Sequence, residues 1–165
     1  MCASTNRMAV VGIGNNLLSD DGAGIHALAL VAADAEADVS CIDGGTVGLA
    51  LLNRLADLDG LVALDAMILG KKPGTVTVLE SDAMDRHLRQ QHGSVHEVGL
   101  SDLVDALRLR GELPARRALI GIEPADMGWG TEPSAAVAAA VPKAAAIARR
   151  LVREWRAVPS REASS

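Results

Sequence analysis

A chain of 165 residues is long enough for one domain that buries roughly 70% of the surface exposed by its unfolded form. Apolar residues make up 49%, yet Phe and Tyr are absent and only two Trp occur, so the core must consist of Ala, Val, Leu and Ile. A net charge of −5 with only short basic patches argues against a nucleic-acid partner, and no apolar run reaches the roughly 18 residues of a membrane span.

The cysteines and the first residues of the sequence bear on the compartment. Cys2 and Cys41 form neither a Cys-X-X-Cys pair nor a disulfide framework. Residues 1–7 lack the apolar region of a signal peptide. We therefore expect a cytoplasmic protein that binds neither membrane nor nucleic acid, and we expect it to be a monomer.

The first predicted elements enclose a loop with two acids. The apolar run at residues 8–11 predicts a strand, and Gly12-Ile13-Gly14-Asn15 predicts the turn that follows it. The acids Asp20-Asp21 come next, at the entrance of a predicted helix. The apolar face of this helix recurs at i, i+3, i+4 and i+7 and consists of Ile25, Leu28, Ala29 and Ala32.

This loop matches a dinucleotide-binding turn only in part. The third glycine of that fingerprint would fall at position 17, which is Leu17. Two aspartates at the helix entrance would also repel a pyrophosphate, although the helix end itself attracts anions. We therefore discount a nucleotide cofactor. Helix capping would account for Asp20 or Asp21 but leaves the other acid without a role.

Strands and helices alternate along the rest of the chain. Four further apolar stretches predict strands at residues 39–42, 61–64, 75–79 and 118–122. The third alternates like an edge strand, and the turn before it leaves an antiparallel direction open. Helices are predicted from apolar faces that begin at Leu49, Leu100 and Val137, and Pro142 should kink or break the last of them.

This order predicts a single-domain α/β fold, a three-layer sandwich in which helices flank a mostly parallel sheet of about five strands. The domain should span residues 1–158, with residues 159–165 as a disordered tail. Right-handed crossovers place the carboxyl ends of parallel strands at one edge of the sheet. Ligands bind at this edge, where the strand order reverses.

Acidic residues follow most of the predicted strands, namely Asp20-Asp21, Asp43, Asp65 and Glu123. They should gather on the rim formed by the carboxyl ends of the strands. Neighbouring carboxylates would repel one another, and a bound cation would relieve that repulsion. Helix capping is the simpler interpretation of any one of these acids. For the set, placed after successive strands, we favour a site.

Six short motifs follow one another along the chain. They are Gly12-Ile13-Gly14-Asn15, Asp20-Asp21-Gly22-Ala23-Gly24, Asp43-Gly44-Gly45-Thr46, Asp65-Ala66, His96 before Gly99-Leu100, and Gly121-Ile122-Glu123-Pro124. In this order and spacing, the chain from Met8 to the last helix resembles the nickel–iron hydrogenase maturation endopeptidases. Each motif alone is common, whereas six in order are specific.

The resemblance implies an endopeptidase that removes the C-terminal extension of a hydrogenase large-subunit precursor after iron and nickel have been inserted. By their positions in the motifs, Asp21, Asp65 and His96 would bind the metal and act in catalysis. Asp43 would be a further catalytic acid, and Glu123 would lie only at the rim. Many relatives carry Glu where this chain has Asp21, so the reach of this ligand is shorter here.

The residue types suit this chemistry. Two carboxylates and one imidazole are appropriate ligands for nickel, and without a thiolate or a second ligand histidine a tightly resident ion is not expected. We therefore expect the nickel to come from the substrate. His96-Glu97 does not begin a His-Glu-X-X-His motif and no Gly-X-Ser-X-Gly occurs, which disfavours a zinc protease or a serine nucleophile.

Several mechanisms remain open. The nickel of the substrate could polarise the scissile carbonyl or activate a water, with Asp43 as general base. It could equally serve only to position the peptide. A non-catalytic nickel carrier or docking protein in hydrogenase assembly could use the same ligands.

Two histidines compete for the ligand position. Residues 81–94 are polar and predict no clear element, and His92 lies near the end of this stretch. His92 and His96 are four residues apart, but Gly, Ser and Val lie between them and are poor helix formers. His96 comes just before the apolar helix face at Leu100, which would hold it in place. We expect His96 to be the ligand and His92 to be solvated.

Overall fold

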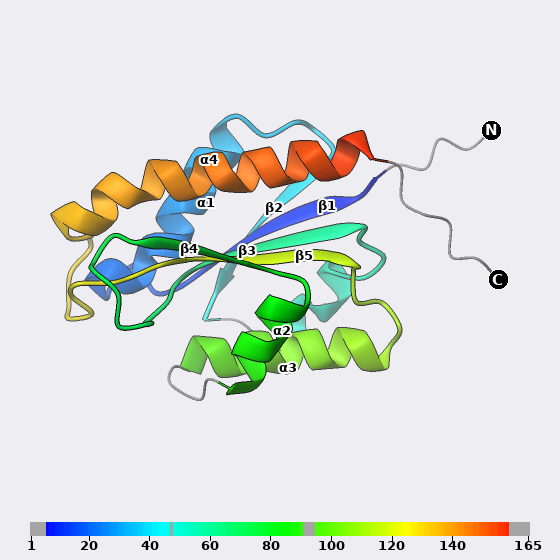
Figure 1. Ribbon diagram of the computed structural model, residues 1–165, viewed down its shortest axis with the longest axis horizontal. Helices are drawn as coiled ribbons and strands as arrows, with labels where there is room; N and C mark the ends of the chain where they lie inside the picture. The colour runs from blue at the N-terminus through cyan, green and yellow to red at the C-terminus, as the bar shows by residue number, and fades with distance from the viewer. Residues whose placement is uncertain (1–5, 47, 91–94, 159–165) are drawn as a thin grey trace.

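Five strands form one sheet in the order β2-β1-β3-β5-β4 (Figure 1). The computed structural model describes residues 6–46, 48–90 and 95–158, with side chains described from residue 99 onward in the last segment. Of the sequence predictions, His92 and the tail at 159–165 lie outside the described residues. The strands are β1 (Met8–Ile13), β2 (Val39–Gly45), β3 (Gly60–Ala66), β4 (Val76–Glu80) and β5 (Arg116–Ile122).

The strand pairing agrees with the predicted sheet. β1 pairs in parallel with β2 and β3, and β3 pairs in parallel with β5. β4 joins β5 antiparallel and lies at the edge. The predictions of a mostly parallel five-stranded sheet and of an edge position for the fourth strand are therefore confirmed.

Helices cover both faces of this sheet (Figure 1). They are α1 (Ala23–Ala33), α2 (Asp82–Gln90), α3 (Val95–Leu109) and α4 (Ala135–Ala157), with 3-10 turns η1 (Ser19–Gly22) and η2 (Leu49–Arg54). α1 and α4 pack on one face, and α2, α3 and η2 pack on the other, so the sandwich has three layers. In the described part of the chain, no helix combines the length and apolar character needed to cross a membrane.

The buried face of α1 is shifted by one position along the sequence from the predicted face. Its buried stripe contains Gly24, Ala27, Leu28 and Val31. The predicted face residues Ala29 and Ala32 are exposed. Since α1 is almost entirely apolar, with His26 as its one polar side chain, periodicity alone does not identify the stripe that faces the sheet.

The predicted break in the last helix is absent, because α4 continues through Pro142. The proline is exposed, while Val141 and Ala144 beside it are buried against the sheet. This packing offsets the ~3 kcal/mol that a proline costs inside a helix. The polar stretch without a predicted element contains α2, whose residues Met84 and Leu88 are buried.

A buried ion pair fixes α2 and α3 against the sheet. Arg117 of β5 donates to both carboxylate oxygens of Asp85 in α2, at 2.9 and 2.8 Å, and Arg108 of α3 donates to the same carboxylate at 2.8 Å. The hydrogen bond from Arg117 holds the pKa of Asp85 below its usual value. The helix that carries His96 is thereby anchored to the strand beside β3.

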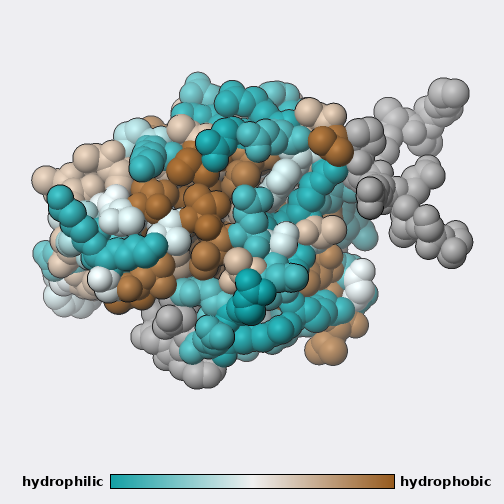
Figure 2. All heavy atoms as spheres, in the orientation of Figure 1, coloured by the Kyte–Doolittle hydropathy of each residue, from teal (hydrophilic) through white to brown (hydrophobic). Residues whose placement is uncertain are grey.

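Apolar side chains remain accessible beside the free edge of the sheet. Figure 2 shows them between α4 and β4, where Val76 and Val78 of β4 and Ile147 of α4 are only half-buried. Lys71 donates from its Nζ to Thr77 Oγ1 at 3.0 Å, which places a charged side chain against β4. Charges at such an edge discourage pairing with another strand.

Two glycines bring the start of α1 directly onto the strand ends. A Cβ on Gly24 would lie 2.1 Å from the carbonyl oxygen of Leu64 and 2.3 Å from that of Ile13. A Cβ on Gly14, which has a φ of 141°, would lie 2.0 Å from the carbonyl oxygen of Asp21. The start of α1 therefore packs against the ends of β1 and β3, and the loop between β1 and α1 closes on itself at Gly14 and Asp21.

Replacement of Gly24 by alanine should destabilise the fold strongly. The new Cβ would overlap two backbone carbonyls that cannot move without distorting β1 and β3, and overpacking of this kind costs about 1–3 kcal/mol or more. Gly48→Ala is the matched control, because Gly48 has φ −160° and nothing within 4 Å of its Cβ position. Urea denaturation measures both variants, and equal stability would contradict the close contact at Gly24.

Candidate functional site

The strand order reverses between β1 and β3. From β1 the chain passes to β2 on one side and then returns to β3 on the other. The loop after β1 contains Asp21, and β3 ends with Asp65 and Ala66. Two of the predicted metal-binding acids therefore flank the switch point at which ligands bind in α/β sheets.

Asp21 is held within η1. It is 6% exposed, and its Oδ2 accepts a hydrogen bond from the backbone N–H of Asn15 at 3.1 Å. Its own N–H donates to the carbonyl of Leu18 at 2.9 Å. The loop after β1 thus fixes both the backbone and the carboxylate of this residue.

Asp65 lies at the end of β3 and is 3% exposed. Its Oδ1 accepts the N–H of Ala66 at 2.8 Å. Side chains alternate along a strand, so Asp65 shares a sheet face with Leu61 and Ala63, which pack in the layer of α2 and α3. The carboxylate of Asp65 is therefore directed to the layer that contains the helix of His96.

His96 is the second residue of α3, and its side chain lies outside the described part of the structure. The amino end of α3 lies at the same end of the molecule as the carboxyl ends of the parallel strands (Figure 1). The first turn of α3, which contains His96, therefore lies at the same end of the molecule as the strand end that carries Asp65. Its role as a ligand remains a prediction.

Asp43 is not brought together with Asp65. It is exposed near the end of β2, and its Oδ1 accepts the N–H of Gly45 at 2.9 Å. β1 separates β2 from β3, which corresponds to a backbone separation of about 9–10 Å. Asp43 shares a sheet face with Cys41, which packs in the α1 layer, whereas Asp65 shares the opposite face with Leu61 and Ala63, so the two acids point to opposite faces of the sheet.

Asp20 and Glu123 hold loops in place. Asp20 is fully buried, and its carboxylate accepts the N–H groups of Ala125, Asp126 and Ser134 at 2.8, 2.9 and 2.6 Å, together with the Ser134 hydroxyl at 2.8 Å. Glu123 accepts the N–H groups of Leu69 and Gly70 at 2.8 and 3.1 Å. Both acids therefore bind backbone groups of distant loops, and α1, the helix that follows Asp20, has no side-chain cap hydrogen bond.

The partners of Asp20 could not be found by local sequence reasoning. A capping role was considered for the helix that follows Asp20, whereas the carboxylate binds Ser134, the N-cap residue of α4, 114 positions away. Burial alone would raise the pKa of Asp20, but its four hydrogen bonds hold the pKa below the usual value. Asp20 thus stays ionised at the amino end of a helix, where negative charge is favourable.

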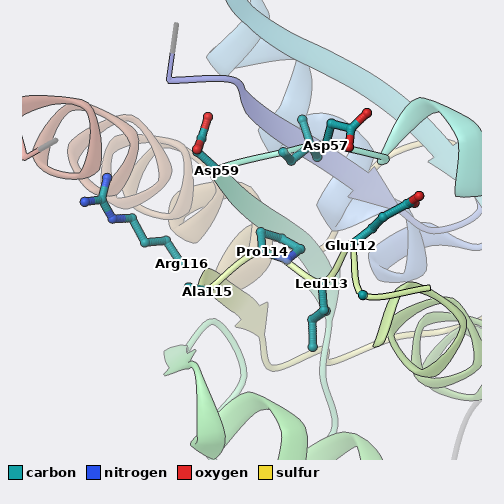
Figure 3. A pocket seen from close by; sticks show the side chains of 9 residues that line it. Asp57, Asp59, Glu112, Leu113, Pro114, Ala115 and Arg116 are labelled. Atoms are coloured by element: carbon teal, nitrogen blue, oxygen red, sulfur yellow. The ribbon is translucent and has the colours of Figure 1, made fainter. Parts of the chain in front are cut away.

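A solvent-open cavity of about 510 Å³ lies at the other end of the sheet (Figure 3). It is lined by residues that precede β3 and β5, including Asp59 and Glu112. Asp59 accepts the N–H of Arg7 at 2.7 Å, and Arg116 donates to the carbonyls of Trp155 and Val158. These side chains hold the ends of the chain in place, so we assign the functional site to the carboxyl edge.

A metal at the rim would be bound incompletely by the described side chains. Among these, no three His, Cys, Asp or Glu residues lie close enough to hold an ion. Asp21 and Asp65 can provide carboxylate oxygens, and His96 would add an imidazole. This oxygen and nitrogen donor set suits a divalent first-row metal such as nickel, whose remaining positions would be open to ligands from a substrate.

Replacement of Asp20 by asparagine should lower stability at neutral pH by about 1–3 kcal/mol, because the buried N–H groups lose a charged acceptor. The lowered pKa of Asp20 means that its contribution is present above the unfolded-state pKa of about 3.9 and is lost as pH falls through the folded-state pKa. The variant should therefore show a shallower loss of stability in acid, measured by urea denaturation across pH. Asp102→Asn, at an exposed position of α3, is the control and should match the wild type.

Comparisons with known proteins agree on one family. Residues 25–150 match the family described as hydrogenase maturation protease. The chain is 35% identical to the hydrogenase expression/formation protein HupD of Rhizobium leguminosarum bv. viciae, over 90% of this chain and 75% of the relative. It is 37% identical to the hydrogenase 2 maturation protease of Escherichia coli K12, over 72% and 73% of the two chains.

Solved structures give the same result. The fold is similar to that of the hydrogenase maturating endopeptidase HybD from E. coli, with a TM-score of 0.84, 29% identity and coverage of 90% of this chain and 93% of the other. The [NiFe] hydrogenase maturation protease HybD from Thermococcus kodakarensis matches with a TM-score of 0.77, 30% identity and coverage of 88% and 98%. The chain therefore belongs to the hydrogenase maturation protease family, whose members are peptide hydrolases.

Proposed function

We propose that the protein removes the C-terminal extension of a nickel–iron hydrogenase large-subunit precursor after nickel insertion, and that it recognises the nickel within that precursor. The placement of Asp21 and Asp65 at the switch point carries this proposal. Family membership supports a hydrogenase precursor as the substrate. His96, in the first turn of α3 at the same end of the molecule, is the proposed third ligand.

Two acids and one histidine would leave coordination positions that ligands of the precursor can fill. The metal is then part of the substrate, and its arrival with the precursor would couple cleavage to completed metal insertion. The ion would supply Lewis-acid chemistry at the scissile carbonyl or position the peptide.

Asp43 is the proposed general base for the attacking water. Its carboxylate lies on the far side of β1 from Asp65. A substrate peptide would therefore have to cross the end of β1 to meet both acids. In this arrangement Asp65 binds the metal from the β3 side of β1, and Asp43 approaches the peptide from the β2 side.

The proposal includes a monomer that acts in the cytoplasm. Cys41 is a free cysteine in β2, which suits a reducing compartment. Burial raises the pKa of its thiol, so the group stays protonated and unreactive.

Cleavage should depend on nickel in the precursor. Nickel-loaded precursor should lose its extension, and precursor that holds iron alone should stay intact, because only the loaded form presents the ion that Asp21 and Asp65 bind. The intact mass of the large subunit measures both outcomes. Cleavage of the nickel-free form at an equal rate would exclude nickel recognition. Binding of the loaded precursor without any change in mass would indicate a docking or carrier protein.

Variants of the acids should separate metal binding from base catalysis. Asp21→Asn, Asp65→Asn and His96→Ala should each abolish processing and weaken binding of the nickel-loaded precursor. Asp43→Asn should lower kcat about 10²–10⁴-fold, the usual contribution of a general base, while precursor binding is retained. Asp102→Asn serves as the surface control. Full activity of the Asp43 variant would exclude it as the base.

A further inference from the structure

Large apolar side chains are exposed around the carboxyl edge. In the described part of the chain, five such residues lie in segments that follow the parallel strands: Leu17, Leu49, Ile68, Met127 and Trp129. Trp129 is 84% exposed and Leu17 is 56% exposed. A tryptophan this exposed contributes little to folding, and exposed apolar groups that gather in one region mark interaction surfaces.

The segments of Leu17 and Trp129 are bound to each other through the backbone. The N–H of Gly130 donates to the carbonyl of Leu17 at 3.0 Å, and the N–H of Ser19 donates to the carbonyl of Gly130 at 2.8 Å. A Cβ on Gly130 would lie 2.6 Å from Ser19 Oγ, so the two segments are in close contact. We call Leu17, Met127 and Trp129, which these two segments present, the apolar lip.

The buried carboxylate of Asp20 holds the lip in one conformation. It binds the N–H groups of Ala125 and Asp126, just before Met127, while the N–H of Asp20 donates to the carbonyl of Asp126 at 3.0 Å. An apolar surface ordered in advance loses little conformational entropy when a partner binds. Tryptophan is also the residue most enriched among those that dominate binding energy at interfaces.

The lip adjoins the proposed active site. Leu17 and Asp21 belong to the same short loop, and Asp20, which anchors the lip, is the immediate neighbour of Asp21. A polypeptide bound at Asp21 would therefore lie next to the two segments that carry Leu17 and Trp129. We propose that the apolar lip docks an apolar segment of the precursor next to the bond that is cut, an inference that rests on the proposed function.

The chain contains two tryptophans, and this allows a direct test. In Trp155→Phe protein labelled with 5-fluorotryptophan, Trp129 gives the single fluorine NMR signal. With unlabelled nickel-loaded precursor, this signal should shift and lose its sensitivity to solvent deuterium as the indole is buried. If Trp155→Phe does not fold, both signals of the unsubstituted chain can be assigned by comparison with Trp129→Phe.

Kinetics provide the second readout. Trp129→Ala should raise the KM for the precursor about tenfold, the effect of losing about 1.4 kcal/mol of binding energy, with kcat and melting temperature unchanged. Leu109→Ala is the matched control, because Leu109 is 90% exposed at the carboxyl end of α3, away from the rim. Its KM should equal that of the wild type.

The fluorine signal and the kinetics together show whether the docking proposal is wrong or the proposed proteolytic function is wrong. Cleavage with an unchanged fluorine signal and an unchanged KM for Trp129→Ala would overturn the docking proposal alone. A fluorine shift without cleavage would retain docking and overturn the protease step. A signal that moves with protein concentration in the absence of precursor would assign the lip to a second copy of the chain and overturn the proposal.

Discussion

The contact between the start of α1 and the ends of β1 and β3 determines how the rim is built. Because Gly24 has no side chain, its backbone approaches the carbonyls of Ile13 and Leu64 directly. The helix then begins after a short loop, and η1 within that loop packs against β3. Asp21 is consequently held beside the strand end that carries Asp65. A larger residue at position 24 would separate the two acids.

The acids of the rim all accept backbone N–H groups, but Asp21 and Asp65 bind near neighbours in the chain, whereas Asp20 and Glu123 bind distant loops. Asp20 and Glu123 bind backbone N–H groups of the loops around them, so each buried charge is satisfied within the protein. Asp21 and Asp65 flank the switch point, where an external cation can balance their charge. Asp20 and Glu123 thus hold distant loops together, and the other two acids are the pair that we propose as metal ligands.

The sequence predicted the elements with strong patterns and missed the features that depend on distant contacts. Apolar runs identified all five strands, and the faces of α3 and α4 were right because their Leu and Val residues recur at helical spacing. The face of α1 was displaced because nearly all its residues are apolar. The placement of Asp21 and Asp65 followed from the rule for parallel sheets. The role of Asp20 depends on Ser134 and has no local signal.

The hydrogen bonds of Asp20 also set an order of assembly. They join the loop after β1 to Ser134, the N-cap residue of α4, across 114 residues. Contacts of such long sequence separation form late in folding, since the chain between them must first be ordered. During synthesis the hydrogen bonds between Asp20 and Ser134 therefore cannot form until Ser134 has left the ribosome. We expect the nascent chain to be without proteolytic activity until its last helix docks, so that an incomplete protein cannot act on a precursor.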